Sequence, residues 1–125
     1  MRVVIGSWHA LAQTAWLDNP NTVFVSTRGW IARGDNVVEI GGDRLRVAMF
    51  ILAARGGPVY FRDLANALYG DRADGGPVND NDCVRLYIWH ARRRLAPLGI
   101  AIDTEHTIGY RARLLPLPAI AEAAE

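Results

Sequence analysis

The sequence has 125 residues, of which 50% are hydrophobic and 22% are charged, a balance that indicates one globular domain with a hydrophobic core. No apolar run approaches the roughly 20 residues of a membrane-spanning helix, and the apolar start is too short for a signal peptide, so we expect a cytoplasmic protein. The single cysteine, Cys83, excludes an internal disulfide and a multi-cysteine zinc site, and we expect it to be a small buried residue.

Positive charge is concentrated in one segment. Residues 83–113 carry six arginines and two acidic residues, a net charge of +4, whereas the whole chain carries +1. All fourteen basic residues are arginines, and an arginine-biased genome is the alternative reason for the absence of lysine. Because arginine makes two-point hydrogen bonds with phosphate and guanine, we expect this segment to meet nucleic acid.

The N-terminal residues leave two interpretations open. Val3–Ile5 fits the start of a strand. Ser7 can cap a helix over Trp8–Leu17, where apolar residues recur at helical spacing, although the same residues also fit a strand and a loop. Trp8 and Trp16 share one stripe and need burial, either on the core of the domain or against a second copy in a homodimer.

Residues 22–40 predict a small antiparallel sheet. Thr22–Ser26 is β-branched and aromatic, as strands are. Gly29–Arg33 and Val37–Ile40 flank a Gly-Asp-Asn turn, which is the signal of a hairpin between two short apolar runs.

The apolar spacing then changes to that of helices and predicts three of them. The first covers about 43–55 and ends at a Gly-Gly-Pro sequence. The second covers about Arg62–Tyr69, after the short extended pair Val59-Tyr60. The third covers 79–95 and ends before Pro97.

The third helix has the most informative sequence. Asn79 and Asp82 stand in the spacing of a capping box at its start. Its apolar face is expected to consist of Val84, Tyr87 or Ile88, Ala91 and Leu95. Its other face is expected to carry Arg85, Trp89, Arg92 and Arg93.

After this helix, Ile100–Asp103 and Tyr110–Arg113 fit two strands of a hairpin. A small sheet, three helices and a terminal hairpin are the element order of an α+β winged helix-turn-helix. Residues 40–113 resemble the DNA-binding effector domain of the OmpR/PhoB-type response regulators. The residues that match the motifs of this family are Tyr69-Gly70 after the second helix, Val84, Ile88, Arg92, Arg94 and Leu95 in the third, and Ile102, Thr104, Gly109 and Tyr110 in the hairpin.

The resemblance implies three segments, namely an N-terminal extension with the small antiparallel sheet (1–39), the winged helix-turn-helix (40–113) and a C-terminal tail (114–125). Because 39 residues are too few for a receiver domain, we expect a stand-alone effector domain without a phosphorylation switch.

The resemblance also implies binding to double-stranded DNA in a transcriptional regulator. The helix 79–95 would enter the major groove, and the wing 103–110 would lie near the minor groove. This sequence departs from the family at positions 85, 87, 89, 90, 106 and 107, so the target sequence stays open. The residues expected to contact DNA are Arg85, Trp89 and His90 at base edges, Tyr87, Arg92 and Arg93 at phosphates, His106 and Thr107 at the wing tip, and Arg111 at the backbone, where Arg113 also attracts phosphates.

Two histidines among these positions suggest that DNA binding strengthens as the pH falls through about 6.5, where a free imidazole gains charge. The alternative function is a winged-helix module for protein interaction, which would contact RNA polymerase or another regulator through the loop at 70–78 and the N-terminal tryptophans.

An enzyme is not expected, because the sequence has no phosphate loop with a lysine, no HExxH motif and no nucleophile elbow. No cofactor is expected. The loop 71–78 lacks the alternating ligands and the closing glutamate of a calcium loop, so no metal is expected either.

Overall fold

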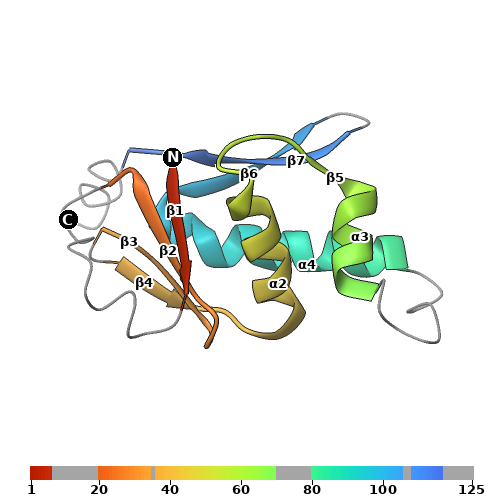
Figure 1. Cartoon of the computed structure of the whole chain (residues 1–125), viewed down its shortest axis with the longest axis horizontal. Helices are drawn as coiled ribbons and strands as arrows, with labels where there is room; N and C mark the ends of the chain where they lie inside the picture. The colour runs from red at the N-terminus through yellow and green to blue at the C-terminus, as the bar shows by residue number, and fades with distance from the viewer. Residues whose placement is uncertain (7–19, 35, 70–79, 106–107, 117–125) are drawn as a thin grey trace.

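The computed structural model describes residues 1–6, 20–34, 36–69, 80–105 and 108–116. These residues form two sheets and three α-helices, an α+β arrangement in which the first four strands lie on one side of the helices and the C-terminal hairpin runs above them (Figure 1). The elements are β1 (Arg2–Gly6), β2 (Thr22–Ser26), β3 (Trp30–Arg33), β4 (Asn36–Glu39), α2 (Gly42–Ala53), β5 (Val59–Tyr60), α3 (Phe61–Tyr69), α4 (Asp80–Leu95), the 3-10 helix η1 (Ala96–Leu98), β6 (Ile100–Glu105) and β7 (Gly109–Leu114).

The first sheet, which we call sheet A, has the strand order β1-β2-β3-β4. The predicted antiparallel arrangement is confirmed for β2, β3 and β4. The strand expected at Val3–Ile5 is present as β1, for which no partner was predicted; it pairs with β2 in parallel and makes the sheet mixed. All five residues of β2 are buried, since the strand has a neighbour on each side and apolar cover on both faces. Parallel strands cannot be joined by a tight hairpin, and the connecting residues 7–19, including the predicted helix and both tryptophans, lie outside the described residues.

The two faces of sheet A pack differently. Val23, Val25 and Ile31 belong to the main core together with the helices. Phe24 and Ala32 point to the opposite face, as alternation along a strand requires, and form a second, smaller cluster. One continuous core therefore joins sheet A to the winged helix-turn-helix.

The three helices follow the predicted periodicity. α2 begins one residue before the prediction and ends two residues before it, within the usual uncertainty of helix ends. In α4 the predicted apolar face is confirmed, because Val84, Ile88, Ala91 and Leu95 are at most 1% exposed. Cys83, expected to be buried, is half-buried and packs against this core. No helix in the described part of the chain is long and apolar enough to cross a membrane.

The C-terminal hairpin of β6 and β7 is the predicted wing. It pairs with β5 through β7, so that the second sheet, sheet B, has the order β5-β7-β6. The pairing requires a glycine at position 109, because a Cβ there would stand 1.9 Å from the carbonyl oxygen of Val59. This close approach gives a physical reason for the Gly109-Tyr110 motif.

Arg33 connects sheet A to the turn that follows α4. Its side chain is only 2% exposed and points to the same face of β3 as Ile31. Its Nε donates a hydrogen bond to the carbonyl oxygen of Pro20 at 2.7 Å, and its Nη1 donates to those of Leu98 and Gly99 at 2.9 and 3.0 Å. Burial lowers the pKa of the Arg33 guanidinium from its usual value. The arginine thus fixes the position of sheet A relative to the turn that leads into the wing.

Candidate nucleic-acid interface

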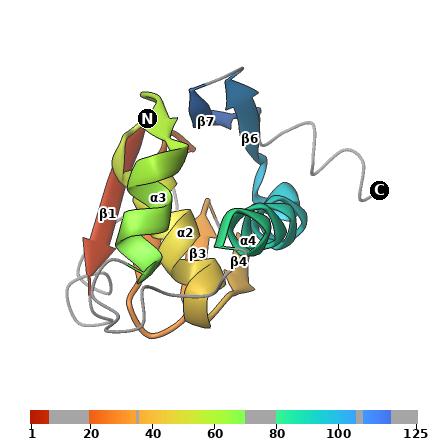
Figure 2. The same cartoon turned by 90° about the vertical axis from the view of Figure 1, so that its right-hand side faces the viewer.

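The face of α4 that turns away from α2 and α3 is exposed. Figure 2 looks along α4 and shows the β6–β7 hairpin above the helix, with α2 and α3 to one side of it. Arg85, Trp89 and Arg93 recur every fourth residue and therefore lie in one row on this face, and all three are exposed. Leu86 lies beside the row and is 52% exposed. We call these four residues the α4 ridge.

Trp89, in the middle of the α4 ridge, contacts Arg93 and His90. Trp89 is 49% exposed, and the guanidinium carbon of Arg93 lies 4.8 Å from the centre of its ring. The ring of His90 meets the Trp89 ring edge to face at a centroid distance of 4.9 Å. These contacts hold a large aromatic side chain at the surface instead of in the core. At the surface it is able to contact a ligand.

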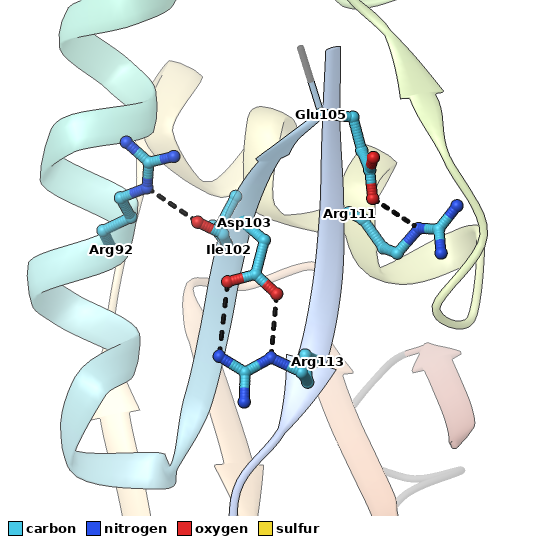
Figure 3. Close-up of polar contacts among 6 residues, drawn as sticks. All are labelled: Arg92, Ile102, Asp103, Glu105, Arg111 and Arg113. Carbon is cyan, nitrogen blue, oxygen red and sulfur yellow. Dashed lines mark hydrogen bonds and ion pairs between the residues drawn. The ribbon is translucent and has the colours of Figure 1, made fainter. Parts of the chain in front are cut away.

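Arg92 connects α4 to the wing. Its Nε donates to the carbonyl oxygen of Ile102 at 2.8 Å (Figure 3), and its Nη2 donates to the hydroxyl of Thr104 at 2.6 Å. The guanidinium also lies 5.7 Å from the centre of the Tyr110 ring. These four residues are motif residues of the resemblance, and the fold brings them into one cluster. Arg92 therefore positions the wing, and its predicted contact with phosphate stays a prediction.

Replacing Arg92 by alanine is expected to loosen the wing and to lower the free energy of unfolding by about 1.5–3 kcal/mol, the usual range for a hydrogen bond from a charged group. Hydrogen exchange of the backbone amides in β6 and β7 measures the loosening, and it should become faster. The matched control is Arg93→Ala, which removes a neighbouring arginine without a contact to the wing. Equal exchange rates in the two variants would contradict this role of Arg92.

The arginines of β7 are paired across the hairpin (Figure 3). Arg113 donates to both carboxylate oxygens of Asp103, at 2.8 and 3.3 Å, and this hydrogen bonding holds the pKa of Asp103 below its usual value. Arg111 forms an ion pair of 3.1 Å with Glu105. Both pairs are exposed to solvent, so each contributes little to stability. They neutralise the two carboxylates of the wing, which would otherwise repel a phosphate backbone.

Two predicted contact residues, Arg85 and Tyr87, belong to the N-terminal half of α4. Arg85 borders a hollow of about 220 Å³ between α4 and the wing. Tyr87 is half-buried beside Tyr69 and Cys83. The pKa of Tyr69 is raised, first by burial and then by its neighbours Tyr87 and Cys83. Positions 106 and 107, the predicted wing tip, lie outside the described residues, so their contacts with DNA stay a prediction.

Arg94 lies on the flank of α4 opposite the wing. Its Nε donates to the carbonyl oxygen of Glu39 at 2.7 Å and so connects α4 to the end of β4. Among the described residues, no group of three or more histidine, cysteine, aspartate or glutamate side chains is placed to hold a metal ion.

No family model and no curated protein matches the sequence. The C-terminal domain of the nisin resistance regulator NsrR, a lantibiotic response regulator, is similar in fold, with a TM-score of 0.59 and 17% identity over 71% of this chain and 88% of that chain. The DNA-binding domain of the response regulator AdeR, solved in complex with an intercistronic region, has a TM-score of 0.58 and 12% identity over 74% and 95%. This chain therefore has the winged helix-turn-helix fold of response-regulator effector domains, the fold that its resemblance to the OmpR/PhoB type predicted.

Proposed function

We propose that this chain binds double-stranded DNA in a sequence-specific manner and acts in a transcriptional regulator. The observation that carries the proposal is the α4 ridge, a row of exposed arginine and aromatic side chains on a helix whose outer face is covered by no other described element. An α-helix fits the width of the major groove, where each base pair presents its own pattern of donors and acceptors.

The wing supports this orientation. Arg92 holds β6 against α4, so the hairpin stands beside the helix at a fixed place. With α4 in the major groove, the hairpin reaches the adjoining minor groove, as in winged-helix docking. The fold likeness to a domain solved with an intercistronic region agrees with this placement.

The residues of α4 take different roles in this proposal. Arg85, nearer the start of the helix, points beside the wing and is suited to guanine, which offers two acceptors to one guanidinium. Trp89 and His90 cover the groove floor as an apolar and polar pair. Arg93 meets a phosphate, since its guanidinium lies over Trp89 at the outer end of the ridge.

The test is the salt dependence of the dissociation constant for a short duplex, measured by fluorescence anisotropy. Each phosphate contact adds about 0.9 to the slope of log affinity against log salt, so Arg93→Ala should flatten the slope by about one. The matched control is Arg2→Ala, because Arg2 is an exposed arginine on β1, on the opposite side of the molecule from α4 (Figure 2). A slope that Arg93→Ala and Arg2→Ala leave equally unchanged would contradict the placement of α4.

A second candidate is a protein-interaction module for RNA polymerase or another regulator. It is favoured by the exposure of Leu86 and Trp89, since apolar side chains half in solvent also suit a protein partner. The absence of duplex binding at low salt, together with binding of RNA polymerase that Leu86→Ala and Trp89→Ala weaken, would favour this candidate.

A further inference from the structure

A cleft of about 610 Å³ lies between sheet A and the C-terminal half of α4. Three segments enclose it, namely the turn before β3 with the first residue of that strand, the stretch from the end of β4 to the first turn of α2, and α4. Its charged and aromatic lining consists of Arg28, Trp30, Glu39, Arg44, Arg93 and Arg94, with His90 beside them. The volume is in the range of small-ligand sites, which is roughly 300–1,000 Å³.

The charges of the cleft are unbalanced. Four arginines face it and one carboxylate, that of Glu39, does. Within the described residues, none of these four arginines forms an ion pair. The Nε of Arg94 donates to the carbonyl oxygen of Glu39, whereas the side chains of Arg28 and Arg44 form no hydrogen bond with another described residue. Four arginines that line one hollow with a single carboxylate produce a positive potential that an anion relieves.

The positions of the arginines suit a phosphate in particular. Arg28 reaches the cleft from the turn before β3, and Arg44 reaches it from the first turn of α2, so the two approach from separate elements. The start of α2 adds the positive end of its helix dipole on the same side. Guanidinium groups bind phosphate oxygens in a planar, two-point geometry.

We propose that this cleft binds a phosphate group through Arg28 and Arg44, with Arg93 and Arg94 completing the site. Two sources carry this chemistry, a free phosphorylated small molecule and a phosphodiester of a bound duplex. Arg93 lines the cleft and also belongs to the α4 ridge, so the two surfaces are continuous. The duplex source rests on the proposed function and would extend the DNA contact from α4 to sheet A.

The test uses the full chain and the double variant Arg28→Gln/Arg44→Gln, which leaves the α4 ridge intact. The control Arg2→Gln/Arg55→Gln removes the same charge from two exposed arginines that do not line the cleft. In the first arm, inorganic phosphate is titrated at constant ionic strength against chloride, and the NMR signals of the arginine Nε–H groups are followed. A free-phosphate site predicts saturable shifts in the wild type and in the control, and at least a tenfold weaker affinity in the cleft variant.

The second arm measures the salt slope of duplex binding. A duplex phosphate in the cleft predicts a slope lower by about 1.8 in the cleft variant, two contacts of about 0.9 each, than in the control. Saturable phosphate binding that the variant loses identifies the free ligand, and the slope change alone identifies the duplex. If the cleft variant and the control have the same phosphate affinity and the same salt slope, the cleft proposal is overturned. The proposal of DNA binding is still supported in that case if Arg93→Ala flattens the salt slope. If the wild type binds no duplex, the proposed function fails, and the phosphate arm alone decides the cleft.

Discussion

Replacing Arg33 by alanine is expected to lower the free energy of unfolding by about 3 kcal/mol or more. The guanidinium is buried and donates to the carbonyl oxygens of Pro20, Leu98 and Gly99. Hydrogen bonds from a charged group contribute about 1.5–3 kcal/mol each, and a buried carbonyl left without a donor adds a further cost. The substitution also opens a cavity where sheet A meets the end of α4.

Denaturant unfolding followed by circular dichroism measures this loss. Arg33→Lys keeps the charge but not the fork that spans three carbonyls, so it should fall between the wild type and Arg33→Ala. The control is Arg28→Ala, an exposed arginine near the same strand, which should change stability by less than about 0.5 kcal/mol. A loss below about 1 kcal/mol for Arg33→Ala would show that Arg33 does not lock the two parts together.

Replacing Gly109 by alanine is expected to cost about 3 kcal/mol and to separate the wing from β5. The added Cβ would lie 1.9 Å from the carbonyl oxygen of Val59 and 2.9 Å from the amide nitrogen of Phe61. Both atoms belong to backbone, so neither is able to rotate away. Inserting a methyl group into a packed site costs about 1–3 kcal/mol, and a clash with backbone belongs at the upper end.

The same unfolding experiment measures this effect, and the exchange of the Tyr110 amide reports on the β5–β7 pairing. Gly41→Ala is the control, because a Cβ at that position meets nothing within 4 Å and the expected cost at a helix cap stays below about 1 kcal/mol. Equal stability of the two variants would mean that β5 does not run against the wing at this point.

Local pattern predicted most of the fold. The strand Thr22–Ser26 has the predicted bounds, and the helices end within two residues of the predicted positions. The periodicity of apolar residues is sufficient to predict these elements, because burial of one face decides whether a segment is a helix or a strand and which residues point inward. The parallel pairing of β1 was missed, since the partner of a strand is set by the tertiary fold and not by its own residues. Arg33 was missed for the same reason, because its acceptors come from positions 20, 98 and 99.

The candidate site was predicted in part. Arg85, Trp89 and Arg93 lie on one exposed face, as their spacing of four residues indicated. The intramolecular contacts of Arg92 and Arg111 were missed, because their partners stand across the hairpin or on another element. The cleft was missed as well. Its arginines lie at positions 28, 44, 93 and 94, and no local spacing relates the first two to the last two.

We propose that α4 reads the sequence of a DNA duplex. Selection of bound duplexes from a random pool, repeated with the wild type and with Arg85→Ala, tests it most directly. We predict that the wild type enriches one motif. We also predict that Arg85→Ala relaxes the preference at one position of that motif, at a cost of about 1–3 kcal/mol for the matched base pair. A pool that stays random after selection with the wild type, or a motif that Arg85→Ala, Trp89→Ala and His90→Ala all leave unchanged, would contradict the claim.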